Sequence, residues 1–556
     1  MAGQTADLVF CALGGIGEIG MNMAVYGYGP PQKRQWLMVD CGVSFAGEDL
    51  PGVDLVMPDT RFIEAQRKNL MGIVLTHAHE DHFGALIHLW PKLQVPVYAT
   101  RFTAALLEAK RLAGHDAPKI DIRVIPSRAR FSLGPFDIEM IDVAHSIPES
   151  NALAIRTPAG LVIHTGDWKI DETPVIPPVT DRDRLTALGD EGVLALVCDS
   201  TNAIREGRSP SERDVSKSLA ELIGSKKGRV AVTTFASNVG RIRSVAEAAM
   251  ANDRSVVIVG RAMERVCLIA RECGLLDGIP EFLSPENYGF LPRDKVVLVL
   301  TGSQGEARAA LARVAKGEHP DVTLAKDDIV IFSSRTIPGN EKPVGAIING
   351  LVRQGVEVIT DRTHLVHVSG HPRRDELADM YRWVRPKIAI PVHGEDWHLS
   401  EHAKLARSLG VADVLTAHDG QILRLGPGPA GPVAEAPIGR TLLDGNILIS
   451  SGQETVPQRR RLSWSGAVFI ALALSDKGEI VSEPDVKLQG LPLKTREGED
   501  MEDLIADAAL EVLESLSKPK RRDPDAVETA IERGVRAAVD RAWGKKPVCQ
   551  VIVLVV

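Results

Sequence analysis

The sequence predicts a mixed α/β protein built from several folded units, and three observations support this prediction. The chain has 556 residues, which at about 150 residues per domain corresponds to three or four domains. Residues 8–164 contain short strand-like segments separated by glycine and proline, whereas residues 211–360 alternate helices with buried strands. Residues 465–556 add a small α+β unit. With 44% apolar and 25% charged residues, the composition excludes a disordered or collagen-like chain.

The N-terminal part is predicted to form an antiparallel or mixed sheet, because its apolar residues alternate over short runs. The predicted strands are Leu8–Ala12, Met23–Tyr28, Trp36–Val39, Ile73–Thr76, Val95–Ala99, Phe136–Val143, Ala152–Thr157 and Leu161–His164. One helix, Arg101–Ala113, is predicted among them.

The middle of the chain has the pattern of a parallel sheet with helices between its strands. The predicted strands are Arg229–Thr233, Ser255–Val259, Lys295–Leu300 and Asp328–Phe332. Gly426–Pro437 carries four prolines and three glycines, which predicts a linker. The C-terminal unit is predicted as two strands, two helices joined by a basic turn at Lys518–Arg522, and a last strand. These elements are Ala467–Leu474, Glu479–Leu488, Glu499–Leu516, Pro524–Trp543 and Val548–Val556.

Composition also limits where in the cell the protein is expected and which partners it is expected to bind. No apolar run approaches the ~20 residues that span a bilayer, so we expect a cytoplasmic protein without membrane contact. The six cysteines are spaced too widely for a CxxC metal knuckle and are expected to be reduced. The formal net charge is −8, which taken alone argues mildly against a nucleic-acid partner.

Residues 15–20 read GIGEIG and match the glycine spacing of a dinucleotide-binding loop, with Asp40 twenty residues further on. That motif requires a helix to begin at its third glycine. Here Met21–Gly29 alternates like a strand instead. We therefore predict a glycine-rich loop at the rim of some other site.

The strongest motif is HAHEDH at residues 77–82, directly after a predicted buried strand. Only 15 histidines occur in the chain, so three of them within six residues are improbable as an accidental surface loop. Imidazole together with carboxylate suits zinc, or manganese with weaker selectivity. The loop is expected to direct His77 and His79 at one ion, and Asp81 and His82 at another.

Two metal ions need further ligands from distant sequence. His145 and Asp167 each follow a short predicted strand, and His393 lies in IPVHGE at 390–395. Singly, each would be read as an ordinary core or loop residue. Together with the first cluster they complete two coordination shells, in which Asp167 is the natural bridging carboxylate.

This pattern of HxHxDH, a later histidine and a later aspartate resembles the metallo-β-lactamase-type hydrolases. The resemblance implies an αββα sandwich and gives Asp40 a supporting role behind the metal ligands. Further motifs flank the α/β insertion: CDST at 198–201, HVSGH at 367–371, and the segment around His393. They are similar to the additional motifs of the β-CASP nucleases. A histidine in the third motif is typical of RNA-directed members of that group, so His393 favours RNA.

Two more stretches, TFASNVGR at 234–241 and FSSRTIPGNE at 332–341, resemble the bacterial ribonuclease J family. The resemblance implies a metallo-β-lactamase domain in two parts (1–208 and 361–425), an inserted β-CASP domain (209–360), a linker (426–464) and a C-terminal α+β domain (465–556). It also implies 5′→3′ exonuclease activity on single-stranded RNA with a preference for 5′-monophosphate ends, endonuclease activity, and a role in RNA processing and decay. The C-terminal domain is expected to form a homodimer or homotetramer, because its apolar last strand would otherwise be a bare edge. The sequence identifies no RNA-decay partner protein.

The expected chemistry uses two divalent ions, zinc before manganese or magnesium, to activate water and to stabilise charge on the phosphate. Asp81 is expected to orient the water, and His371 to protonate the leaving 3′-oxygen while Asp199 holds its ring and raises its pKa. His367 is the competing proton donor. The side chains expected to bind RNA phosphate are Ser237, Asn238, Arg241, Ser333, Ser334, Asn340, His367 and Ser369. For Ser237 and Asn238, a plain helix N-cap is the alternative interpretation.

Three rival functions remain on the sequence alone. A small-molecule hydrolase of the same fold would not need the insertion or the additional histidines. A DNA-directed nuclease is disfavoured by His393, and a non-catalytic RNA-binding scaffold would be expected to lack ligands. Since metal ions outweigh the charge of their carboxylate ligands, the net charge of −8 describes the outer surface rather than the site.

Overall fold

The computed structural model describes residues 6–114 and 117–556. Residues 1–5 and 115–116, which fall in the predicted segment 1–208, lie outside the described residues. The chain divides into two compact units. The first runs up to Ser44 and from Val56 to Thr441, and the second comprises Phe45–Leu55 and Leu442–Val556. No helix in the described part of the chain is long and apolar enough to cross a membrane.

The first unit contains an eight-stranded sheet in the order β22-β21-β1-β2-β3-β6-β7-β8. Its strands are β1 (Asp7–Gly14), β2 (Met23–Gly29), β3 (Gln35–Val39), β6 (Leu70–Val74), β7 (Val97–Ala99), β8 (Ile122–Val124), β21 (Gln421–Gly426) and β22 (Gly431–Glu435). The strands from β22 to β3 pair antiparallel, and those from β3 to β8 pair parallel. The predicted mixed sheet is confirmed. Two short strands, β4 (Ser44–Phe45) and β5 (Leu55–Pro58), follow β3 along the chain.

A seven-stranded sheet faces it, in the order β20-β19-β13-β12-β11-β10-β9. Its strands are β9 (Arg130–Leu133), β10 (Phe136–Asp142), β11 (Asn151–Thr157), β12 (Gly160–His164), β13 (Val193–Asp199), β19 (Ile388–Val392) and β20 (Asp413–Val414). Side chains of the two sheets share one core, in which Phe10 and Val74 meet Ile155, Val197 and Ile390. Burial on both faces explains why β13 and β19 are nearly continuous apolar runs.

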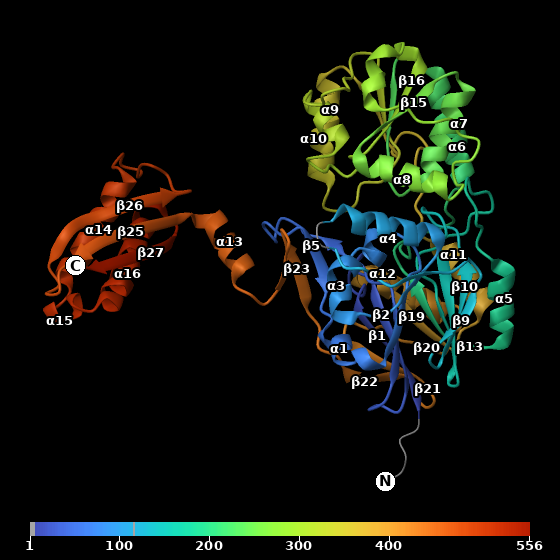
Figure 1. Ribbon diagram of the computed structural model, residues 1–556, viewed down its shortest axis with the longest axis horizontal. Coiled ribbons are helices and arrows are strands. Elements are labelled where there is room, and N and C mark those ends of the chain that lie inside the picture. The colour runs from blue at the N-terminus through green and yellow to red at the C-terminus, as the bar shows by residue number, and fades with distance from the viewer. Residues whose placement is uncertain (1–5, 115–116) are drawn as a thin grey trace, which may run out of the picture. The chain divides into compact units, whose positions relative to one another are not determined.

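Helices cover the outer faces of this pair of sheets. α5 (Arg182–Glu191), α11 (Arg374–Val384) and α12 (Asp396–Ser408) bury apolar side chains, such as Leu188 and Tyr381, against the seven-stranded sheet. On the side of the other sheet lie α1 (Arg61–Ala65), α3 (Leu86–Leu93) and α4 (Arg101–Ala113). The short helix η1 (Arg67–Asn69) follows α1 along the chain. The αββα sandwich that the resemblance implies is present (Figure 1).

The inserted module leaves the seven-stranded sheet at Asp199 and returns at Ile388, although β13 and β19 are neighbours in that sheet. It contains a five-stranded parallel sheet in the order β15-β16-β14-β17-β18. Its strands are β14 (Val230–Thr233), β15 (Ser255–Val259), β16 (Val296–Leu300), β17 (Ile329–Phe332) and β18 (Glu357–Ile359). α6 (Glu212–Ser225) and α7 (Val239–Ala251) lie on one side of it, and α9 (Ala310–Lys316) and α10 (Glu341–Arg353) on the other (Figure 1). α8 (Arg261–Glu272), η2 (Pro285–Phe290) and η3 (Arg293–Lys295) complete the module.

The second unit ends in a three-stranded sheet in the order β26-β25-β27. α14 (Met501–Ser515) and α16 (Pro524–Trp543) pack on one face of β25 (Ala467–Leu474), β26 (Ile480–Gln489) and β27 (Val548–Val555). β23 (Arg440–Asp444), β24 (Ile447–Ser450) and α13 (Thr455–Ser465) precede this sheet in the chain. The basic run predicted as a turn instead contains a short helix, α15 (Lys518–Arg521).

The stretch predicted as a linker from Gly426 differs in the structure. β22 falls inside it and pairs antiparallel with β21, so the eight-stranded sheet continues past the predicted boundary. Proline is tolerated there because β22 is an edge strand, where a missing backbone N–H breaks no ladder hydrogen bond.

Candidate metal centre and active site

The proposed ligands gather at one edge of the sandwich, where strands end. Residues 77–82 follow β6, and the short helix α2 (Glu80–Phe83) carries Asp81 and His82. His145 follows β10, Asp167 follows β12, and His393 follows β19. These strands run in the same direction within each sheet, so their carboxyl ends meet at one edge. Four remote segments of sequence are thereby brought together.

His77, His79, His145 and Asp167 form the first group, with one ligand atom from each within 4.8 Å of the others. His79 Nδ1 lies 3.1 Å from His77 Nε2 and 3.0 Å from His145 Nε2. Oδ2 of Asp167 is 3.6 Å from Nε2 of both His77 and His145. Three imidazoles and a carboxylate at such spacing match a tetrahedral zinc shell.

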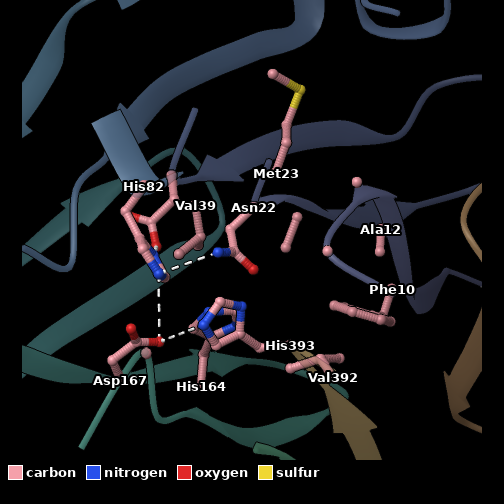
Figure 2. A pocket seen from close by; sticks show the side chains of 15 residues that line it. Phe10, Ala12, Asn22, Met23, Val39, His82, His164, Asp167, Val392 and His393 are labelled. Atoms are coloured by element: carbon pink, nitrogen blue, oxygen red, sulfur yellow. Dashed lines mark hydrogen bonds and ion pairs between the residues drawn. The ribbon is translucent and has the colours of Figure 1, made fainter. Parts of the chain in front are cut away.

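Asp81, His82, Asp167 and His393 form the second group on the same criterion. The other oxygen of Asp167, Oδ1, lies 3.2 Å from His82 Nε2 and 3.5 Å from His393 Nε2. Figure 2 shows His82, Asp167 and His393 facing one another. Asp81 Oδ2 is 3.6 Å from His82 Nε2 and 3.8 Å from His393 Nε2. Asp167 thus presents one oxygen to each group, the arrangement of a bridging carboxylate.

Hydrogen bonds behind the histidines fix which ring nitrogen faces the centre. Nδ1 of His82 lies 2.7 Å from Asp40 Oδ2, and Nδ1 of His145 lies 2.7 Å from the carbonyl oxygen of Gly370. With those protons directed outward, the Nε2 lone pairs point inward at Asp167. Asp167 Oδ1 is buried and has no hydrogen-bond donor among the described residues. Lone pairs facing a buried carboxylate oxygen fit a cation between them.

Electrostatics agree with metal binding. Burial lowers the pKa of His77 and His145 well below its usual range and that of His79 to about 4, so these rings are neutral and available as ligands. Burial also disfavours the charged form of His82, but the carboxylates of Asp167, Asp81 and Asp40 outweigh it and raise the pKa of His82. The second group therefore has a negative potential that attracts positive charge.

His371 lies beside the two groups without belonging to either of them. Its Nδ1 is 2.8 Å from Asp199 Oδ2, as predicted for a ring held by that carboxylate. Burial alone would lower the pKa of His371, but Asp199 and Asp167 outweigh burial and raise it to about 9. Asp199 therefore favours the protonated form of His371 next to the metal centre. Asp199, His371 and His393 also form a third close group.

The glycine-rich loop predicted at a rim supports this site. Gly15 accepts a hydrogen bond from the backbone N–H of His393, and no helix follows the third glycine, which rules out the dinucleotide motif. Asn22, which the sequence did not single out, places its Nδ2 3.0 Å from His82 Nε2 (Figure 2). The same amide donates to Asp81 O at 3.1 Å. Gly15 has φ +94°, and an added Cβ would lie 2.5 Å from Asn22 Oδ1. The glycine spacing of residues 15–20 was the one sequence signal that pointed to this support of the site.

Thr76 and Gly370 were also missed as supports of the ligands. Thr76 donates to Asp40 through its backbone N–H and its hydroxyl, both at 2.8 Å. A Cβ on Gly370 would lie 2.6 Å from the ring of His145, so only glycine fits there. Thr76 directly precedes HAHEDH, and Gly370 lies inside HVSGH, so both belong to regions that the sequence did identify.

The predicted phosphate-binding side chains divide into three sets. Ser333 and Ser334 follow β17, and Ser333 Oγ donates to the carbonyl oxygen of Val366, which precedes His367. Ser369 lies in the same segment as His367 and accepts from Asn202. Asn238 is buried, caps α7 by accepting from Arg241 N at 2.9 Å, and lines a cavity with His145; Ser237 is half-buried before it. Asn340 lies apart from both of these sets: it stands at the start of α10, and its side chain contacts Gln304.

Arg241 differs from the prediction that it binds RNA phosphate. Its side chain is 0% exposed and forms an ion pair with Glu212 at 2.8 Å. Nη1 of the guanidinium donates to Ser333 and to the carbonyl oxygen of Val366, whereas Nε is buried without a partner among the described residues. The prediction is corrected because the side chain has no exposed surface and its charge is already paired with Glu212.

Comparison with known families agrees with this architecture. Residues 35–175 match the beta-lactamase superfamily domain, and residues 227–351 match the ribonuclease J beta-CASP domain. Residues 355–417 match the Zn-dependent metallo-hydrolase RNA specificity domain, and residues 454–556 match the ribonuclease J C-terminal domain. The fold of a crystallised Enterococcus faecalis protein of unknown function is also similar, with a TM-score of 0.52, 15% identity, and coverage of 76% of this chain and 100% of that one.

Similarity to curated relatives extends over nearly the whole chain. The chain is 53% identical to ribonuclease J of Sinorhizobium meliloti, over 99% of this chain and 98% of that protein. It is 38% identical to ribonuclease J of Corynebacterium glutamicum, over 97% of this chain and 74% of that protein, and 39% identical to the Mycolicibacterium smegmatis one, over 96% and 95%. This chain therefore belongs to the ribonuclease J family and is a metal-dependent hydrolase that acts on RNA.

Proposed function

We propose that this enzyme is a 5′→3′ exoribonuclease that prefers 5′-monophosphate ends, has additional endonuclease activity, and serves RNA processing and decay. The observation that carries the proposal is the position of His371, which contacts Asp199 beside a carboxylate-bridged ligand centre and lies in the segment that also carries His367 and Ser369. The ligand centre supports phosphodiester hydrolysis. The segment with His367 and Ser369 offers polar groups for the 5′ end.

We assign two divalent ions to this centre, with zinc as the expected metal and manganese or magnesium as the alternatives. His77, His79, His145 and Asp167 would hold one ion, and Asp81, His82, Asp167 and His393 the other, with Asp40 supporting His82. When bound, the ions supply an activated water and offset the charge of the phosphate. Nitrogen-rich ligands favour zinc over magnesium.

Three side chains carry the proton chemistry in this proposal. Asp81 accepts a hydrogen bond from the attacking water and orients it toward phosphorus. His371 donates its proton to the leaving 3′-oxygen, and Asp199 holds the ring in position. His367 is the weaker candidate for donor, because burial and the nearby charges of Arg241 and Arg335 hold its pKa well below the usual range.

The 5′-phosphate is proposed to bind beside His371. Ser334 Oγ and His367 Nδ1 are buried without a hydrogen-bond partner among the described residues, which is costly unless a ligand or water completes them. Ser369 Oγ accepts from Asn202 at 2.9 Å and keeps its own hydroxyl proton for a ligand. The proposed phosphate-binding set also includes four residues with fewer supporting contacts: Ser333, Ser237, Asn238 and Asn340. The distance between this pocket and the two metal ions would place the first phosphodiester bond of the RNA at the cleavage site.

We propose the domain division that the sequence predicts, except at the start of the linker. The metallo-β-lactamase domain comprises 1–208 and 361–425 and continues through β22, the β-CASP domain comprises 209–360, and the oligomerisation domain comprises 465–556. Ile552 and Leu554 of β27 are 51% and 56% exposed on an edge strand, which supports a homodimer or homotetramer. A cytoplasmic location is part of the same proposal.

The test is a parallel assay on one RNA sequence with a 5′-monophosphate, a 5′-triphosphate or a 5′-hydroxyl, and on the matching single-stranded DNA. We expect mononucleotides to be released fastest from the 5′-monophosphate RNA. Equal rates on the three RNAs would overturn the end preference, and faster cleavage of DNA would favour a DNA-directed nuclease.

A further inference from the structure

A row of four buried charged side chains connects the metal centre with the inserted module. Lys169, Asp171, Glu212 and Arg241 are 1%, 3%, 6% and 0% exposed. None of them has a role in the chemistry proposed above. Buried charges are expensive unless they are paired, so a continuous row of them calls for a reason.

The middle of the row joins the metallo-β-lactamase domain and the β-CASP domain. Lys169 Nζ lies 3.0 Å from Asp171 Oδ2 and 3.8 Å from Glu212 Oε1. Asp171 Oδ2 also accepts from the backbone N–H of Glu212 at 2.9 Å, which fixes the start of α6. Glu212 Oε2 then accepts from Arg241 Nη2 at 2.8 Å. Each carboxylate is thus shared between the two domains.

One end of the row holds the proposed phosphate pocket. Arg241 Nη1 donates to Ser333 Oγ at 2.6 Å, to Ser333 O at 3.0 Å and to Val366 O at 2.9 Å. Ser333 Oγ in turn donates to Val366 O at 2.7 Å. Since Val366 directly precedes His367, one guanidinium ties together both segments that contribute to the pocket.

The other end holds the ligand loops. Lys169 is two residues after Asp167, and its backbone N–H donates to Ala144 O at 2.8 Å, next to His145. A shift of the pocket relative to these loops would separate Glu212 from Lys169 or from Arg241. Either separation leaves a buried charge unpaired, which makes the row resist such a shift.

We infer that this row of charges is a positioning device that sets the spacing between the 5′-phosphate pocket and the metal centre. Arg241 acts through Ser333 and Val366, and Glu212 acts through Arg241. The inference rests on the proposed function, because it explains how a bound 5′ end is held at a fixed distance from the cleavage site. Internal cleavage does not use the pocket and should not depend on this spacing.

The test is Arg241→Lys, which keeps a positive charge against Glu212 but cannot reproduce the planar fork that reaches Ser333 and Val366. We expect the ratio of kcat/KM on 5′-monophosphate RNA to that on 5′-hydroxyl RNA to fall about 10-fold, the effect of losing one or two charge-assisted hydrogen bonds. Endonuclease kcat on a circular RNA and the metal content should stay within about twofold. Arg243→Lys is the matched control, since Arg243 lies on the same helix and pairs with Glu247 instead.

Two results would overturn the inference. One is an unchanged ratio in a folded Arg241→Lys enzyme, and the other is an equal loss of exonuclease and endonuclease activity, which a merely structural role would give. If Arg241→Lys does not fold, Glu212→Gln is measured by the same criteria, because it removes the shared charge but keeps an acceptor. A wild-type enzyme without any preference for the 5′-monophosphate would refute the proposed function itself, before a variant is made.

Discussion

Replacing Asp40 by asparagine tests whether the residues behind the histidines organise the metal centre. Asp40 Oδ1 accepts from the backbone N–H of Thr76, and Oδ2 accepts from the Thr76 hydroxyl and from His82 Nδ1 at 2.7 Å. An asparagine keeps the shape and one acceptor oxygen, which can still serve Thr76. Its NH2 group then faces His82, where an acceptor is required.

His82 can respond only by moving its proton from Nδ1 to Nε2, the atom that faces Asp167, or by rotating away. Either response removes one ligand from the second group. Loss of such a supporting contact typically weakens metal binding 10–100-fold, which corresponds to about 1.4–2.7 kcal/mol. We expect a loss of this size for one of the two ions and little change for the other.

The assay is competition for metal against a chromogenic chelator, followed by counting of the ions retained per chain. Asp328→Asn is the control, because Asp328 is equally buried and accepts backbone hydrogen bonds from Arg229 and Ala325 in the inserted module. Its metal affinity should match that of the wild type. If Asp40→Asn binds both ions as tightly as the control, the supporting role of Asp40 is refuted.

Three further predictions follow from the same geometry. His371→Gln should lower the exonuclease rate by about 10²–10⁴, the range for loss of a general acid, with both ions retained; loss of metal would show that His371 is a ligand instead. A proton donor is active below its pKa, so the rate should fall as pH rises through the pKa of His371. Asp199→Asn should move that fall to lower pH, because it removes the main charge that raises this pKa. An unmoved pH profile would contradict the pairing of Asp199 with His371. Ile552→Glu combined with Leu554→Glu should reduce the mass measured by light scattering to that of the monomer, and an unchanged mass would exclude β27 from the interface.

Much of the fold was predictable because the local pattern and the motifs agreed. The fully apolar strands of the insertion, such as Ile329–Phe332, have few other interpretations when helices alternate with them. The linker from Gly426 was predicted wrongly at its start, because proline signals a break in a chain but is also accepted on an edge strand. Whether an edge strand is present depends on the neighbouring strand, which the local sequence does not contain.

The candidate site was predictable where residue type and spacing carry the chemistry, as in HAHEDH. Arg241 shows the limit of that reasoning. A serine, an asparagine and an arginine at a helix start look like phosphate ligands, but the partner of Arg241 is Glu212, 29 residues away. Asn22 shows the opposite case, because it lies two residues after a loop that matched an unrelated motif and yet contacts Asp81 and His82. Side-chain direction decides both cases, and it follows only from the tertiary fold.

We propose that Asp167 joins two ion sites that act as one catalytic centre. The most direct measurement is to strip the enzyme of metal, add zinc stepwise, and record the ribonuclease rate against ions bound per chain. We predict almost no rate for the metal-free enzyme and a plateau at two ions per chain. Full activity at one ion per chain, or RNA hydrolysis that survives complete removal of metal, would contradict it.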